Sequence, residues 1–296
     1  MPTIAHPYPE RPIAHGLSRA HLANDYDVEA SVPDLPGYMR QFIHLSDEAR
    51  RTLADHCRLD VPYGPLPAHK LDIFMPSATG PSPIMVFFHG GAWKGSNKEC
   101  RAFPALTVCP RGAIWISVEY PLAPDASLET QTESAQQAIA WIAENAQSFG
   151  GDARRILVMG HSAGGHLATM GLFRILHAQP ALAKNFELLT ISAVFDLEPM
   201  MFTKVNDWLK LNPPRVLEHS PISQIPSQSP ALHALAGGSE PGVFIRQSLD
   251  MVGAYAARGL ASRFTALPHR NHFSVLEEFA LEESPLHQAL MAFIKR

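Results

Sequence analysis

The stretch Arg155-Ile156-Leu157-Val158-Met159-Gly160-His161-Ser162-Ala163-Gly164 runs from four consecutive apolar residues directly into Gly-x-Ser-x-Gly. An apolar helical pattern follows, from Gly165 to His177. This order predicts that Ser162 lies in a tight turn between a buried strand and a helix. Such a turn strains the serine backbone, and the flanking glycines leave no side chain to collide with it. We therefore predict that Ser162 is a nucleophile; the alternative is a glycine-rich structural turn.

The composition is that of a globular protein with a sizeable core. The 296 residues are 46% hydrophobic, which suits one large α/β domain, although length alone also permits two. The net charge of −4, without a long run of one sign, argues against nucleic acid or an anionic membrane as partner. The three cysteines lack metal-ligand spacing and indicate reduced thiols in a cytoplasmic protein. The N-terminus carries no signal-peptide pattern, and no apolar run has membrane-spanning length.

Short apolar runs of strand length recur along the chain, and helical patterns separate the later ones. The predicted strands cover residues 57–62, 71–75, 84–88, 113–118, 156–159, 188–195, 232–236 and 263–267. One predicted helix, 127–149, has its apolar residues on a single face and ends at Gly150-Gly151. The alternation predicts right-handed crossovers and a mostly parallel, eight-stranded α/β sheet flanked by helices.

Two segments fall outside this alternation. Residues 1–56 are rich in proline, histidine and charge, have helical hints at 38–45 and 46–56, and show no strand pattern. We expect an N-terminal arm that packs over a core domain of residues 57–296. Residues 197–228 are proline-rich, follow the sixth strand, and are predicted to form a small lid; an ordinary surface crossover is the alternative. The lid candidates include Met200, Met201, Phe202 and Trp208.

A serine nucleophile needs a base and a group that orients the base. Because ligands bind at the carboxyl ends of parallel strands, both groups are expected in the turns after later strands. His272 follows the eighth strand and is our predicted general base. Glu240 is the first carboxylate after the seventh strand and is predicted to orient the imidazole. The alternatives that remain open are His269 for the base, and Asp250 and Asp196 for the acid.

Donors for an oxyanion are predicted after the third strand, where Phe87-Phe88-His89-Gly90-Gly91-Ala92-Trp93 ends in successive glycines. Glycines let backbone N–H groups approach an oxyanion closely. We expect donors from Gly90, Gly91 or Ala92, together with the N–H of Ala163. A plain glycine turn is the alternative, and His89 is expected to be structural.

With these residues placed, the chain resembles the α/β-hydrolase superfamily over residues 57–296. His89-Gly90-Gly91-Ala92-Trp93 is similar to the His-Gly-Gly-x-Trp signature of kynurenine formamidases (arylformamidases) and related esterases. Tyr26-Asp27, Val61-Pro62-Tyr63-Gly64 and Gly237-Gly238-Ser239-Glu240 resemble bacterial members of this group. Better-known formamidases carry aspartate where this chain has Glu240.

The resemblance implies a serine hydrolase that cleaves an aryl formamide, such as N-formylkynurenine, or a small amide or ester through an acyl-enzyme on Ser162. A carboxylesterase acting on short-chain acyl esters is the alternative, and a non-catalytic ligand-binding protein on the same scaffold is a minor one. The resemblance implies no metal and no organic cofactor, and a small-molecule substrate as partner; a homo-oligomer stays open. Aromatic residues expected to contact an aromatic leaving group, or else to pack in the core, are Trp93, Tyr120, Phe195, Phe202 and Phe273.

Overall fold

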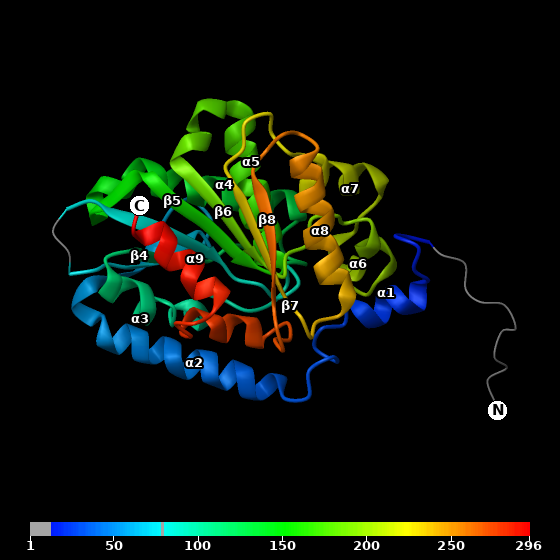
Figure 1. Cartoon of the computed structure of the whole chain (residues 1–296), viewed down its shortest axis with the longest axis horizontal. Helices are drawn as coiled ribbons and strands as arrows, with labels where there is room; N and C mark the ends of the chain where they lie inside the picture. Colours follow the sequence, from blue (N-terminus) through cyan, green and yellow to red (C-terminus); the bar gives the residue numbers. More distant parts are fainter. Residues whose placement is uncertain (1–12, 78–79) are drawn as a thin grey trace, which may run out of the picture.

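A computed structural model describes residues 13–77 and 80–296 of the chain. One 8-stranded sheet, in the order β1-β2-β4-β3-β5-β6-β7-β8, runs through it with helices on both faces (Figure 1). The first two strands are antiparallel to their neighbours, and all later pairs are parallel. This confirms the predicted mostly parallel, eight-stranded α/β sheet. Among the described residues, no helix is long and apolar enough to cross a membrane.

The strands agree with the predicted runs at most positions. They are β1 (Cys57–Pro62), β2 (Lys70–Phe74), β3 (Ser82–Phe88), β4 (Ile114–Val118), β5 (Gly151–His161), β6 (Phe186–Ile191), β7 (Leu232–Gly237) and β8 (Ser262–Leu267). The prediction for the sixth strand was wrong at its end, because β6 stops at Ile191 rather than continuing to residue 195. Ser192 there adopts φ +50°, which is incompatible with an extended strand.

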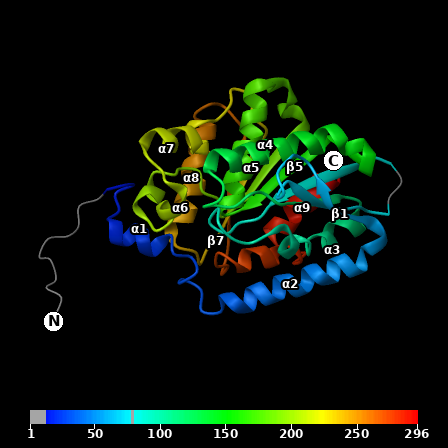
Figure 2. The ribbon, with the colours of Figure 1, turned by 180° about the vertical axis from the view of Figure 1, so that it is seen from behind.

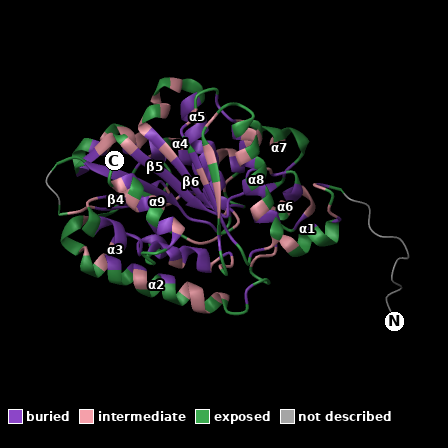
Figure 3. Ribbon diagram, viewed as in Figure 1, coloured by how far each residue is buried: buried purple, intermediate pink, exposed green. Residues whose placement is uncertain are grey.

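Alternate residues of the central strands pack into two separate apolar layers, as the pleat requires. On β3, Ile84 and Val86 join one layer, whereas Met85 and Phe87 join the other. The first layer is covered by α4 (Leu128–Asn145), α5 (Ala163–Ala178) and α8 (Gly242–Ala256). The second is covered by α2 (Leu35–Thr52), α3 (Ala105–Val108) and α9 (Pro285–Ile294). The central strands β3 and β4 are entirely buried, whereas most residues of the edge strands β1 and β8 are exposed or half-buried (Figure 3).

The helix predicted over residues 127–149 is confirmed as α4 with a short 3₁₀ extension, Ala146–Phe149. The Ser127 side chain accepts a hydrogen bond from the N–H of Thr130 and so caps the first turn. Gly150 takes a left-handed conformation, φ +76°, and ends the extension.

The described part of the N-terminal segment contains α1 (Arg19–Asp25), α2 and a 3₁₀ turn, Ala54–His56. The two helical hints at 38–45 and 46–56 therefore belong mainly to one helix, α2, which lies along the outside of the second layer (Figure 2). Residues 1–12 of the predicted arm lie outside the described part of the chain.

Residues 197–228 fold into short helices only: Pro199–Phe202, α6 (Asn206–Leu209), α7 (Pro213–His219) and Pro221–Ser223. This segment contacts the N-terminal one, since Lys204 Nζ lies 2.7 Å from Asp27 Oδ2. The Arg19 guanidinium also lies 5.4 Å from the centre of the Phe202 ring. The segment's role as a lid stays a prediction.

Candidate active site

Ser162 lies in the turn between β5 and α5, as the sequence predicted. Its backbone has φ +54° and ψ −125°, a strained conformation for a residue with a side chain. The turn also needs its glycines: a Cβ on Gly164 would lie 2.1 Å from the carbonyl oxygen of Phe88. A Cβ on Gly160 would lie 2.3 Å from the carbonyl oxygen of Gly164. The strain and the close packing hold a half-buried serine in a tight turn at the carboxyl end of β5.

His272 and Glu240 form a buried hydrogen-bonded pair. His272 Nδ1 donates to Glu240 Oε2 at 2.7 Å, and only 2% of the histidine side chain is exposed. The other carboxylate oxygen, Oε1, accepts from the N–H of Gly237 at 2.6 Å and from Ser192 Oγ at 2.5 Å. These bonds hold the carboxylate in one orientation and leave Nε2 as the free nitrogen of the imidazole.

The other carboxylates and the other histidine weighed from the sequence have different neighbours. Asp250 lies on α8, where its Oδ2 is 3.6 Å from Arg246 Nε. Asp196 bonds to His15 and to the N–H of Glu198. His269 is solvent-exposed and has φ +60°. The structure therefore brings Glu240, and neither aspartate, to His272.

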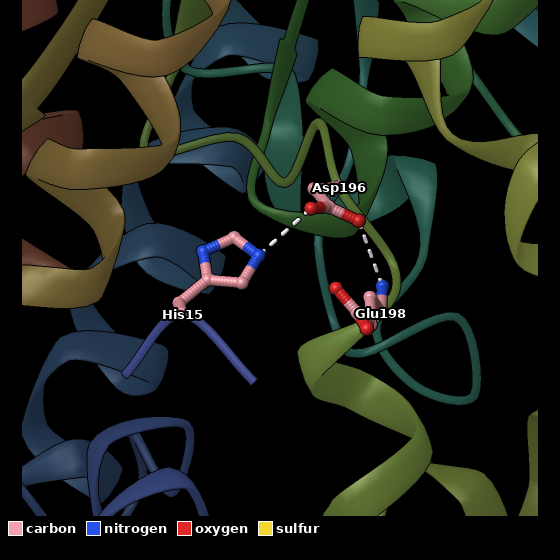
Figure 4. A group of neighbouring side chains, drawn as sticks. All are labelled: His15, Asp196 and Glu198. Atoms are coloured by element: carbon pink, nitrogen blue, oxygen red, sulfur yellow. Dashed lines mark hydrogen bonds and ion pairs between the residues drawn. The ribbon is translucent and has the colours of Figure 1, made fainter. Parts of the chain in front are cut away.

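Asp196 ties the N-terminal segment to the loop after β6 (Figure 4). His15 Nε2 lies 2.8 Å from its Oδ2, and the N–H of Glu198 lies 2.8 Å from its Oδ1. The hydrogen bond that His15 donates to Asp196 raises the pKa of His15, although partial burial opposes this shift. One ligand atom from each of His15, Asp196 and Glu198 lies within 4.8 Å of the others, but Asp196 already bonds to the His15 imidazole and to the backbone N–H of Glu198. This cluster has a structural explanation.

The loop after β3 lies against the serine. A Cβ on Gly90 would lie 2.9 Å from the carbonyl oxygen of His161 and 3.1 Å from the Cβ of Ser162, so the close approach favours glycine there. The next three residues, Gly91, Ala92 and Trp93, all have positive φ, at 117°, 50° and 61°. Such a chain turns its N–H groups in a concerted way, as an anion-binding nest does. Ala163 is the first residue of α5, so its N–H has no partner within the helix.

Side chains from two segments form hydrogen bonds with this loop. His89 contacts the carbonyl oxygen of Gly90 through Nδ1 at 2.8 Å and Glu119 Oε1 through Nε2 at 3.0 Å. Trp208 Nε1 donates to the carbonyl oxygen of Ala92 at 2.8 Å. His89 thus has the structural contacts predicted for it. The contribution of Trp208 was missed, because nothing local in its sequence indicates a partner 116 residues away.

One cavity of about 470 Å³ is lined by Ser162, His272 and residues 90–92. Such a volume is within the range that holds a small organic molecule. Its walls also include Leu35, Met39, Val205, Trp208 and Phe244. Of the aromatic residues proposed to contact substrate, Trp93 and Phe273 line the cavity. Tyr120, Phe195 and Phe202 are absent from the lining and follow the other expectation, core packing. Tyr120 also donates to the carbonyl oxygen of His89.

His161 is a further buried residue of this site that sequence reasoning did not single out. Its Nε2 donates to the carbonyl oxygen of His272 at 2.7 Å, and the two ring centres are 4.7 Å apart. Burial, with the nearby charges of His272 and Arg101, holds the pKa of His161 well below its usual value. His161 is therefore neutral, and it positions the backbone of His272 without competing for protons.

Comparisons with known proteins agree with this architecture. Residues 71–201 match the family model BD-FAE. A kynurenine formamidase of Danio rerio is 29% identical over 80% of this chain and 81% of its own length. Esterase LipQ of Mycobacterium tuberculosis is 29% identical over 77% of this chain and 59% of its own.

Solved structures give the same picture. A crystal structure from Silicibacter superposes with a TM-score of 0.79 at 26% identity, covering 93% of this chain and 99% of that one. An esterase of Pyrobaculum calidifontis, at 19% identity, has a TM-score of 0.67 over 90% of this chain and 92% of its own, which supports the fold. The chain is a hydrolase with the α/β-hydrolase fold. Its relatives within this class are kynurenine formamidases and esterases.

Proposed function

We propose that this chain is a serine hydrolase that cleaves an aryl formamide of the N-formylkynurenine type through an acyl-enzyme on Ser162. The observation that carries the proposal is that Ser162, His272 and residues 90–92 line one cavity. The kynurenine formamidase relatives support the choice of substrate. The proposal includes a small-molecule substrate and, because all three cysteines are free thiols, a cytoplasmic location.

In the first step Ser162 Oγ attacks the formyl carbonyl while Nε2 of His272 takes the hydroxyl proton. Glu240 keeps the imidazole in the tautomer that leaves Nε2 free and stabilises the imidazolium that forms. His272 then gives the proton to the departing aryl amine, which leaves a formyl-serine ester. In the second step water attacks this ester with His272 as base, so that formate and free Ser162 result.

Negative charge develops on the carbonyl oxygen in both steps. The proposed donors are the N–H of Ala163 and N–H groups of Gly90, Gly91 or Ala92, where the loop lies against the serine. One such donor contributes on the order of 10²–10³ in rate. Trp93 would contribute mainly by packing, because its indole N–H donates to His166 Nδ1 at 3.1 Å inside the protein.

The substrate is tested by initial rates on N-formylkynurenine, 4-nitrophenyl acetate and 4-nitrophenyl butyrate. We expect a higher kcat/KM for the formamide than for either ester. A kcat/KM for the formamide far below the ester values would support the alternative, a carboxylesterase for short-chain acyl esters, which the LipQ relative favours. Labelling by a fluorophosphonate probe tests catalysis as such. Absence of a Ser162-dependent adduct would favour a non-catalytic ligand-binding protein.

Replacing Trp208 by phenylalanine should lower kcat by about 5–10-fold, because one hydrogen bond to the donor loop, on Ala92, is lost. Steady-state kinetics on the preferred substrate measure this. Trp141→Phe is a matched control, since Trp141 stacks on Phe149 and does not line the cavity. Equal effects of the two substitutions, or an effect of Trp208→Phe on KM alone, would contradict a role in holding the loop.

A further inference from the structure

Arg101 is a buried cation in the wall of the same cavity. It ends the short 3₁₀ helix Lys98–Arg101, and only 4% of the residue is exposed. Its backbone is firmly placed, because its carbonyl oxygen accepts from Trp115 Nε1 at 2.9 Å and from Ser117 Oγ at 2.8 Å. Arg101 lines the cavity together with Ser162 and His272. Its charge also contributes to the lowered pKa of His161, the residue that positions the backbone of His272.

The guanidinium of Arg101 has no carboxylate partner among the described residues. Its Nη1 donates to the carbonyl oxygen of Cys100 at 2.8 Å, its plane lies over the Phe42 ring at 5.3 Å, and its Nε has no hydrogen-bond partner. Burial lowers its pKa, which reflects the cost of keeping this charge away from water. A buried charge without an anion is costly, so most buried charges in proteins are paired.

Lys98, a second buried cation of the same 3₁₀ helix, is paired with carboxylates. Lys98 is as buried as Arg101, and its Nζ lies 2.8 Å from Asp72 Oδ1, 2.8 Å from Glu99 Oε1 and 3.1 Å from Asp60 Oδ1. Three carboxylates thus surround Lys98, whereas no carboxylate of residues 13–77 and 80–296 pairs with Arg101. The difference indicates that Arg101 is available to an anionic ligand that enters the cavity.

The other charged residues that line the cavity indicate which kind of anion would bind to Arg101. Lys204 is paired with Asp27, and Lys94 lies 4.0 Å from the centre of the Trp208 ring. Unlike Arg101, neither of these two lysines is both buried and unpaired. Asp27 and Glu29 also line the cavity and disfavour a ligand of high negative charge. One free guanidinium matches one carboxylate, which it can bind through two parallel hydrogen bonds.

We infer that Arg101 binds a carboxylate of the substrate, so that the enzyme prefers acyl compounds that carry a carboxylate to those that lack one. The inference rests on the proposed function, because it takes Ser162 and His272 as the reacting groups of this cavity. A formyl group is too small to carry a carboxylate, so the anion belongs to the departing aromatic group. Arg101 thereby determines substrate specificity and takes no part in the proton transfers.

Two matched substrate pairs test the inference, each differing only in a carboxylate replaced by a carboxamide. The first is N-formylkynurenine and its carboxamide; the second is 4-acetoxyphenylacetate and 4-acetoxyphenylacetamide. We expect the acid of each cleavable pair to have a kcat/KM about 10²-fold above that of the amide, as for one charge-assisted bidentate contact. Phenylacetate should likewise inhibit the wild-type enzyme more strongly than phenylacetamide.

The variant Arg101→Met should reduce the acid-to-amide ratio of kcat/KM by about 10²-fold, whereas Arg101→Lys should retain part of the preference. Lys94→Met is the matched control from the same cavity, and its ratio should stay within about fivefold of wild type. Thermal unfolding and fluorophosphonate labelling establish that each variant is folded. If Arg101→Met does not fold, the acid-to-amide ratios of kcat/KM in the wild type, and its inhibition by phenylacetate and phenylacetamide, still test the inference.

Equal kcat/KM values for acid and amide in the wild type would overturn the inference, as would an unchanged ratio in folded Arg101→Met. A ratio that falls in Lys94→Met and not in Arg101→Met would overturn it as well. Failure of the proposed function would give a different result. The enzyme would not cleave the formamides, but it would still cleave 4-acetoxyphenylacetate faster than 4-acetoxyphenylacetamide.

Discussion

The variant Ser162→Ala should lose kcat by about 10⁴–10⁶-fold while the fold stays intact. The acyl-enzyme cannot form without Oγ, and what remains is catalysis by the oxyanion donors and by substrate binding alone. Alanine keeps the Cβ, so it meets the same backbone strain at φ +54° and introduces no new contact. Steady-state kinetics give the loss, and the thermal unfolding midpoint should match that of the wild type.

Ser229→Ala is a suitable control for this experiment. Its hydroxyl lies 2.8 Å from that of Tyr255, and it does not line the cavity, so removing it should leave kcat near the wild-type value. Substantial activity in Ser162→Ala, or a comparable loss in Ser229→Ala, would refute the assignment of Ser162 as nucleophile.

The second large effect is expected for Glu240→Gln, with kcat reduced by about 10³–10⁴-fold. Ser192 Oγ and the N–H of Gly237 both donate to Oε1, so the neutral amide would turn its oxygen toward them and its NH₂ group toward His272. An NH₂ donor facing Nδ1 favours the tautomer with its proton on Nε2, and that tautomer cannot accept the proton of Ser162. The effect should therefore appear in kcat, with little change in KM.

Asp250→Asn is the discriminating control for Glu240→Gln. Asp250 is half-exposed on α8 and faces Arg246, so its replacement should leave kcat close to wild type. A large loss in Asp250→Asn combined with near-normal activity in Glu240→Gln would reverse the assignment of the acid.

Much of the architecture could be predicted from local sequence patterns. The apolar run before Gly160 and the helical pattern after Gly164 predicted the strand, the turn and the helix around Ser162, because each depends on neighbouring residues. The same holds for α4, whose start at Ser127 and end near Gly150 follow from capping chemistry. The end of β6 was mispredicted, since the conformation of Ser192 is not evident from an apolar run.

The candidate site could be predicted only in part, and the missing part has a common cause. Glu240 was placed beside His272 by counting strand ends, a rule about topology. The hydroxyl of Ser192 that orients Glu240, and the indole of Trp208 that holds Ala92, come from segments 48 and 116 residues away. No local sequence pattern predicts such long-range contacts, because they depend on how whole helices, strands and loops pack together.

By itself, then, the sequence determined the fold class, the strained serine and the order of serine, acid and histidine along the chain. These follow from hydrophobic periodicity, from glycine's backbone freedom and from the rule that ligands bind at strand ends. Only the tertiary structure decided that Arg101 is buried with no carboxylate partner in the described part of the chain, while Lys98 has three. Charge pairing is a property of three-dimensional neighbours, so the electrostatic character of the cavity emerges only when distant segments fold together.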